Sequence, residues 1–237
     1  EARPVNPAAY QAYLKGRHLI ERRTEETLRL GLASFEDAAR LDPTFELAHV
    51  GIADAYNLLA FYATLPATVA FPNAEAAARR ALAINPGSAE AMTSLAYGVT
   101  WFDRDLPEAE RLFRKAIDIN PRYSLSHLWF SNILLLAGRM EEARAEVQLA
   151  RGASPMSPGP IAFEGWFPYY GGNFDEALRI FDDAVSLVPD FGALYYWMGL
   201  ALMGAGRNAE AVTSFERGIE LLGRTLMVVS GLACAHA

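Results

Sequence analysis

Residues with catalytic or metal-binding chemistry are few in this sequence, and they are scattered. A histidine can act as a general base or a metal ligand, and a cysteine thiolate is a nucleophile. The chain has four histidines and one cysteine, at His18, His49, His127, His236 and Cys234. No P-loop, Cys-x-x-Cys or His-Glu-x-x-His motif accompanies them, and no Gly-x-Gly-x-x-Gly follows a predicted strand. We therefore predict no catalytic residue, no metal site and no cofactor, and we expect that the chain is not an enzyme.

Adjacent carboxylates could act as an acid and a base, and they occur at Glu25-Glu26 and Glu141-Glu142. Both pairs fall where predicted helices begin, and carboxylates there stabilise the helix dipole. That role accounts for them without catalysis. Cys234 lies on an apolar segment with no activating base nearby in sequence, so we expect a core or interface thiol.

The composition limits the remaining function classes. Of the 237 residues, 52% are hydrophobic and 21% are charged, and the formal net charge is −7. A nucleic-acid surface needs a basic excess, so nucleic acid is a poor candidate partner. The longest uncharged stretch, residues 55–74, contains Pro66 and Pro72 and is not expected to insert into a membrane. The chain starts at Glu1 rather than Met, so we expect a piece of a longer protein, whose compartment, cytoplasmic or periplasmic, stays open.

The segments that carry these residues recur with a fixed period. Glu-Ala pairs recur every 34 residues, at Glu108-Ala109, Glu142-Ala143, Glu176-Ala177 and Glu210-Ala211. Each pair is followed at fixed distances by a large apolar residue, a small residue and then Pro or Gly, as in Phe113, Ala116 and Pro121. The proline series extends back to Pro86 and Pro43, which are separated by a longer step of 43 residues.

Each repeated unit predicts two helices. Between residues 123 and 137 apolar residues recur at helical spacing, and Gly138 can adopt the positive φ that ends a helix. A second helix over residues 140–152 has small residues on one face, and Pro155 closes the unit. One such pair cannot bury its apolar face alone, so neighbouring pairs must stack. We expect second helices to begin near Thr24, Asn73, Leu106, Met140, Phe174 and Asn208.

These repeats closely resemble the tetratricopeptide-repeat (TPR) family. The family pattern is present as His127, Phe130-Ser131, Leu134, Ala143, Val147, Ala150 and Pro155. The resemblance implies an all-α, right-handed α-solenoid of about six helix pairs plus a final single helix, in one array over residues 1–237. Its repeats would cover residues 7–43, 44–86, 87–121, 122–155, 156–189 and 190–223, with a partial repeat at 224–237. His49 and His127 would hold the first bulky position of their repeats and pack there.

The resemblance also implies that the groove lined by the first helices binds a protein or peptide. The residues predicted to contact the partner are Arg17, Asp54, Asn57, Tyr97, Trp101, Asn132, Trp166, Tyr169 and Tyr196. The same face would include Tyr13, Val50, Thr93, Leu128, Ala162 and Leu200. Only Arg17 is basic, which argues against a clamp for a terminal carboxylate. We therefore expect a protein-binding scaffold; the alternative is a regulatory or sensor module of a bacterial signalling protein, fused to a DNA-binding, cyclase or kinase domain, that senses a ligand or partner.

Two stretches depart from the common repeat. The 43-residue step predicts a lengthened first helix or a protruding loop between Leu58 and Pro72. The helix expected over residues 225–236 has an apolar face that no following helix covers, which suggests self-association there.

The fifth repeat has the strongest irregularity. Glu164 stands at a position that is apolar in other copies, and Pro168 follows four residues later. Proline has no N–H, so this first helix should kink, and Glu164 should be paired, protonated or turned to water. One hypothesis is that the kink opens a pocket where Trp166 and Tyr169 contact a ligand; the other is that these aromatic residues only pack.

Overall fold

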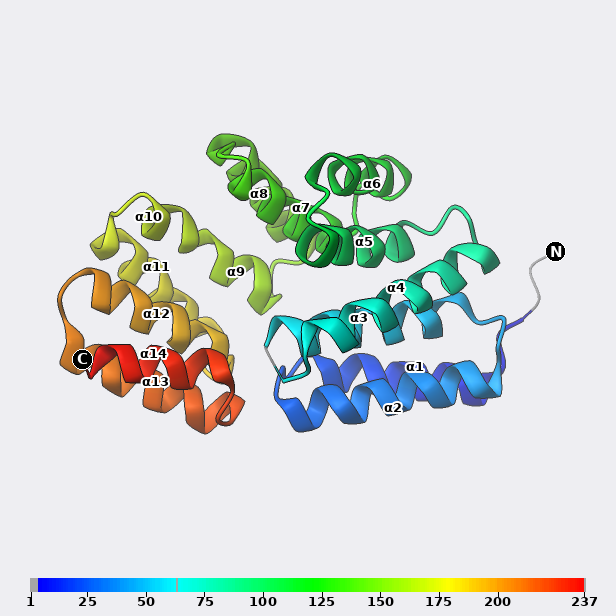
Figure 1. Cartoon of the computed structure of the whole chain (residues 1–237), viewed down its shortest axis with the longest axis horizontal. Coiled ribbons are helices and arrows are strands. Elements are labelled where there is room, and N and C mark those ends of the chain that lie inside the picture. The colour runs from blue at the N-terminus through cyan, green and yellow to red at the C-terminus, as the bar shows by residue number, and fades with distance from the viewer. Residues whose placement is uncertain (1–3, 63, 237) are drawn as a thin grey trace. The chain divides into compact units, whose positions relative to one another are not determined.

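Every repeated segment folds as a helix pair in the computed structural model, which describes residues 4–62 and 64–236 (Figure 1). The described residues contain no β-strand, and none of their helices is long and apolar enough to cross a membrane. The architecture is an all-α solenoid of helix pairs. Contacts divide the chain into two compact units, Glu1–Trp129 and Phe130–Ala237. The single continuous array expected from the repeats stays a prediction.

The first unit contains three helix pairs and the start of a fourth. The first helices of these pairs are α1 (Pro7–Ile20), α3 (Glu46–Phe61) and α5 (Ala89–Gly98), and the π-helical turn η1 (Val99–Asp103) extends α5. Their second helices are α2 (Glu25–Leu41), α4 (Ala67–Ile84) and α6 (Leu106–Ile119). α7 (Ser124–Leu136) begins in this unit and continues into the next.

The second unit completes the fourth pair and contains two more pairs and a last helix. α8 (Met140–Ala153) is the partner of α7 in sequence. The fifth pair consists of α9 (Pro158–Glu164) and α10 (Trp166–Tyr170) followed by α11 (Phe174–Leu187). α12 (Gly192–Gly204) and α13 (Asn208–Leu222) form the sixth pair, and α14 (Leu226–Ala235) is the last described helix.

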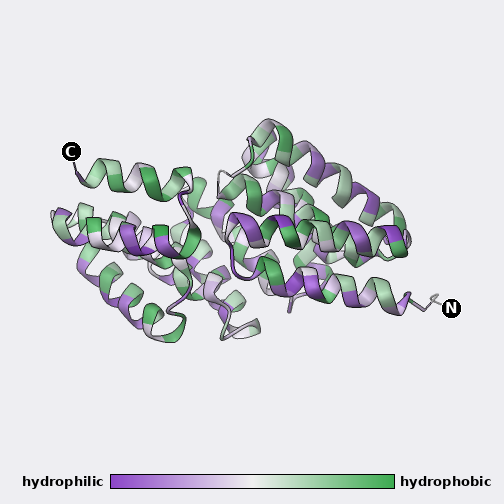
Figure 2. Cartoon of the chain, turned by 90° about the horizontal axis from the view of Figure 1, so that it is seen from below, coloured by the Kyte–Doolittle hydropathy of each residue, from purple (hydrophilic) through white to green (hydrophobic). Residues whose placement is uncertain are grey.

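Most helices bury one face and expose the other. Figure 2 shows hydrophobic and hydrophilic residues along the same helices. In α13, for example, Ala211, Phe215 and Gly218 are buried, whereas Glu216 is exposed. The alternation follows the helical period, so the buried faces of neighbouring helices meet in the interior.

A Glu-Ala pair recurs at the start of the second helices, and each of its two residues has a physical role there. The glutamate lies in the first turn, where its charge favours the helix dipole. At the start of α13, Arg207 binds both carboxylate oxygens of Glu210, at 2.7 and 2.6 Å. At the start of α6, the Asp105 side chain instead accepts the backbone N–H of Glu108. The alanine is 0% exposed in all four pairs, at Ala109, Ala143, Ala177 and Ala211.

The predicted starts of the second helices are confirmed to within one residue for α2, α6, α8, α11 and α13. The expected start near Asn73 is wrong, because α4 begins at Ala67 and runs through Pro72. The proline removes one helical N–H, but Thr68, whose carbonyl loses its partner, is exposed to water. The added residues of this repeat are shared between its two helices, since α3 has 16 residues against 14 in α1 and 13 in α12, and α4 has 18 against 14 in α6.

The fifth repeat has the predicted irregularity. Its first helix is broken at Gly165, between α9 and α10. Of the three expected states of Glu164, the structure shows the paired carboxylate. Its Oε2 lies 3.0 Å from Nη1 of Arg151. The missing N–H of Pro168 and the glycine together explain why the helix does not continue.

The last helix leaves part of its surface uncovered among the described residues. α14 buries Val228, Gly231 and Ala235, whereas Leu226 is 68% exposed. Cys234 is exposed, so it is not a core thiol, and the other alternative, an interface thiol, stays a prediction. Self-association through this helix stays a prediction.

Candidate binding faces of the two units

A polar cluster lies on the first helices of the first unit. Nη1 of Arg17 on α1 lies 3.2 Å from Oδ2 of Asp54 on α3. The hydroxyl of Ser94 on α5 donates to the other oxygen of Asp54. Nδ2 of Asn57 donates to the backbone carbonyl of Ser94 at 3.0 Å. Thus three of the predicted residues meet, and one serine joins them.

Burial and the neighbouring charges shift the pKa values of the two ionisable groups in this polar cluster. Asp54 is 1% exposed, and burial raises the pKa of its carboxyl, while Arg17 and Ser94 oppose that rise. Burial lowers the pKa of the Arg17 guanidinium, but Asp54, together with smaller contributions from Tyr123, Tyr13 and Glu21, raises it by more, and the pKa lies above its usual value. Arg17 therefore stays protonated, and its charge is largely matched by Asp54.

Two buried polar atoms beside this cluster have no hydrogen-bond partner. One is Oδ1 of Asn57, whose residue is 0% exposed, and the other is the hydroxyl of Tyr123. Burial raises the pKa of Tyr123, and the charge of Asp54 raises it further. The neutral phenol therefore keeps its proton and can donate it in a hydrogen bond.

An aromatic pair continues the same face toward the end of α5. The ring of Tyr97 lies 6.1 Å from that of Trp101 and 4.3 Å from that of Trp129. Tyr97 is 4% exposed, but Trp101 is 38% exposed. Trp101 lies in η1, and π-helical turns occur frequently at functional sites.

A larger aromatic cluster lies on the first helices of the second unit. The ring of Trp166 stacks on Phe163 at 3.7 Å and lies 4.2 Å from Trp197. Tyr169 and Tyr196 also contact Trp197, with ring centroids at 6.2 and 5.2 Å. Trp166 is 5% exposed, and its buried Nε1 has no hydrogen-bond partner. The burial favours the packing hypothesis for Trp166 itself.

The structure brings most of the predicted contact residues into two groups. Arg17, Asp54, Asn57, Tyr97 and Trp101 belong to the first unit, and Trp166, Tyr169 and Tyr196 to the second. Asn132 on α7 is 6% exposed, and no described contact joins it to either group.

Sequence reasoning missed three members of these groups. Ser94, Trp129 and Trp197 follow directly after Thr93, Leu128 and Tyr196, which had been placed on the same face. A helical face is wide enough to include neighbours in sequence, so a wider window would have found them.

The histidines inside the repeats have a structural role. Nε2 of His127 lies 2.9 Å from the carbonyl of Pro121, and Nε2 of His49 lies 3.1 Å from that of Pro43. The Tyr195 hydroxyl donates to the carbonyl of Pro189 at 3.0 Å in the same way. The expectation that these histidines pack is confirmed, and among the described residues no three potential metal ligands gather at one place.

Comparisons with known proteins agree with this architecture. Two family models, each described as a tetratricopeptide repeat, match residues 103–158 and 169–222. The peroxisomal targeting signal receptor of Eremothecium gossypii is 27% identical over 195 residues, which are 82% of this chain. The chain spans only 28% of that curated relative's length.

Two solved structures illustrate the shared fold. The type IV pilus biogenesis factor PilW is 19% identical with a TM-score of 0.60, and the match covers 96% of this chain and 99% of PilW. The human IFIT1 dimer with m7Gppp-AAAA is 15% identical with a TM-score of 0.75, covering 94% of this chain and 52% of that one. Repeat pattern, helix pairs and family models all agree, and the chain contains tetratricopeptide repeats, which the family models match over residues 103–158 and 169–222.

Proposed function

We propose that the chain binds a segment of a partner protein on the face formed by its first helices. The tetratricopeptide repeats support a protein-interaction scaffold, and a relative at 27% identity is a targeting signal receptor. The first-helix faces carry aromatic rings and a few hydrogen-bonding groups, which suit an extended or helical peptide.

The exposure of Trp101 is the observation that carries this proposal. Trp129 and Trp166 are 6% and 5% exposed, whereas Trp101 keeps 38% of its surface exposed beside the buried Tyr97. A tryptophan that is rigidly placed but still open gains much by being covered, and such residues dominate many binding interfaces.

The partner segment should not rely on a terminal carboxylate. Arg17 is the only basic residue predicted on this face, and its guanidinium already pairs with Asp54 at 3.2 Å. The unpartnered Tyr123 hydroxyl and Asn57 Oδ1 are better suited to backbone or amide groups, if small movements expose them.

The test is capture of partners from the source cell, identified by mass spectrometry, followed by affinity measurements on a captured protein. We expect Trp101→Ala to weaken binding about tenfold or more, as for an interface hot spot. Phe102→Ala is the matched control, because Phe102 lies next in η1 with 41% exposure but turns to Phe71 on α4. If both folded variants bind with the affinity of the wild type, the partner does not contact Trp101, and the proposal is wrong at this residue.

A further inference from the structure

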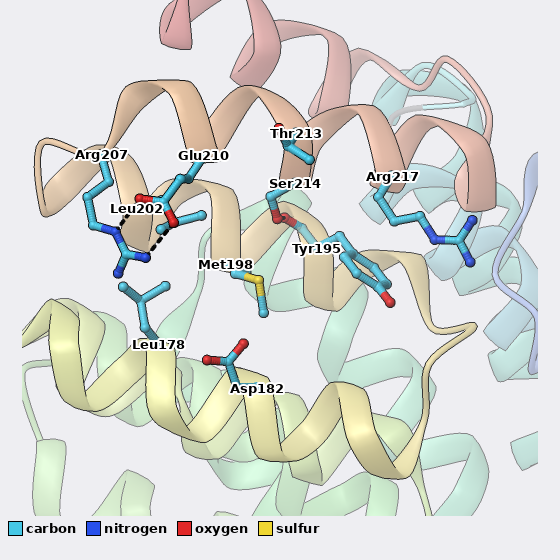
Figure 3. A pocket seen from close by; sticks show the side chains of 10 residues that line it. All are labelled: Leu178, Asp182, Tyr195, Met198, Leu202, Arg207, Glu210, Thr213, Ser214 and Arg217. Atoms are coloured by element: carbon cyan, nitrogen blue, oxygen red, sulfur yellow. Dashed lines mark hydrogen bonds and ion pairs between the residues drawn. The ribbon is translucent and has the colours of Figure 1, made fainter.

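A groove in the second unit lies between two second helices. It is lined by α11 on one side and α13 on the other, with α12 between them, and its volume is about 490 Å³ (Figure 3). That volume lies within the range of roughly 300–1,000 Å³ that is usual for ligand pockets. Figure 3 shows Met198 in the middle of the groove and Leu178 and Leu202 toward the Arg207 end, so this part of the groove is apolar.

The charged residues of this groove are paired within the chain, with one exception. Arg207 binds both oxygens of Glu210, at 2.7 and 2.6 Å, and Arg217 binds Glu220 at 2.7 Å. The side chain of Asp182 lines the groove and has no hydrogen bond or ion pair among the described residues. The charge of Asp182 acts on the nearby Arg207 without forming an ion pair with it, so the groove offers one carboxylate that is not held in an ion pair among the described residues.

The length of the groove suits a short chain segment. The residues of α13 that line it run from Glu210 to Arg217. Seven residues of helix span about 10 Å, the length of about three extended residues.

From this charge and shape we propose that the groove binds a short segment of a partner protein in which leucine or methionine stands next to lysine or arginine. The apolar side chain packs against Leu178, Met198 and Leu202, and the cationic group pairs with Asp182. These residues do not belong to the first-helix faces of the proposed function, so this is a second and separate binding site.

A second groove, in the first unit, shares two repeat positions with this one. Its volume is about 440 Å³, and it lies between α2 and α4 over α3. Glu36 and Ile52 hold there the repeat positions of Asp182 and Met198. An acidic and an apolar residue thus recur at these two positions, although Arg40 and Arg80 also line the first-unit groove.

The test uses blocked synthetic peptides and the full chain with labelled methionine methyl groups. One peptide contains adjacent leucine and lysine; a second has the lysine replaced by glutamate, a third has the leucine replaced by serine, and butylamine alone is the fourth probe. NMR follows the Met198 methyl signal, which Met198→Leu assigns among the six methionines.

We expect the leucine–lysine peptide to shift the Met198 signal and the other three probes to bind at least fivefold more weakly. Asp182→Asn should weaken the first peptide about fivefold, the upper end for an exposed ion pair. Asp183→Asn is the matched control, because Asp183 is the next residue on α11, pairs with Arg179 and does not line the groove; its affinity should not change.

Several outcomes would overturn the proposal. One is an unshifted Met198 signal at peptide saturation, and another is an equal loss of affinity in Asp182→Asn and Asp183→Asn. Equal binding of butylamine would replace the protein segment with a small amine. None of these outcomes bears on Trp101, so the two sites are tested independently.

Discussion

Gly199 on α12 lies directly against the ring of Phe215 on α13. A β-carbon at Gly199 would come within 2.6 Å of that ring, closer than carbon atoms can approach. Phe215 is 0% exposed, so the ring has no free space into which it can move. Gly165 has the same relation to Phe181, at 2.3 Å. In these two pairs, the fifth and the sixth, the helices therefore approach at a distance that only glycine allows.

The first prediction is that Gly199→Ala lowers the free energy of unfolding by about 1–3 kcal/mol, the usual cost of overpacking. Chemical denaturation measures this change. Gly152→Ala is the matched control, since Gly152 lies in α8 with no atom within 4 Å of an added β-carbon. Removing a helical glycine there should raise the free energy of unfolding by about 0.5–1 kcal/mol. A loss in both variants would show that the close approach is not the cause.

The helix pairs could be predicted because particular residues mark where the helices of each repeat begin and end. A glutamate in the first turn, a buried alanine and a closing proline recur in the sequence, and α6, α8, α11 and α13 begin where they indicate. The start of α4 could not be predicted in this way. Pro72 normally marks a helix end, but burial of Ala70 and Phe71 outweighs the lost hydrogen bond.

The side-chain contacts of the candidate site were less predictable. The spacing places Arg17 and Asp54 on one face, but the ion pair depends on how α1 and α3 pack. The sequence likewise does not distinguish Trp101, which is exposed, from Trp166, which is buried. Both hold positions expected on the groove, and only neighbouring helices decide their exposure.

The second prediction concerns the buried indole of Trp166. Trp166→Ala should lower the free energy of unfolding by about 3–5 kcal/mol, because it removes a large side chain from between Phe163 and Trp197. Trp166→Phe should cost much less, because it keeps ring packing and removes an N–H that has no partner. Thermal and chemical unfolding give both values. Partner binding that falls in Trp166→Phe without loss of stability would instead support a ligand contact.

The third prediction concerns the pH dependence of stability through Asp54. Its pKa is raised in the folded state, first by burial, so the folded chain holds this proton more tightly than the unfolded chain. The stability from this proton is complete below the ordinary aspartate range and is lost as the pH rises through the folded-state pKa. Asp54→Asn carries no titrating proton and should lack this contribution.

Replacing Arg17 should enlarge the effect, because Arg17 is the main charge that opposes the raised pKa of Asp54. We expect Arg17→Met to lower the free energy of unfolding by about 3 kcal/mol near neutral pH, since it leaves a buried carboxylate unpaired. The loss should shrink at about pH 4, where more of Asp54 is protonated. Chemical denaturation at several pH values measures both, and Arg17→Met/Asp54→Asn is the control in which the extra dependence disappears. A loss of the same size at every pH would mean that Arg17 acts through packing of its aliphatic part and not through its charge on Asp54.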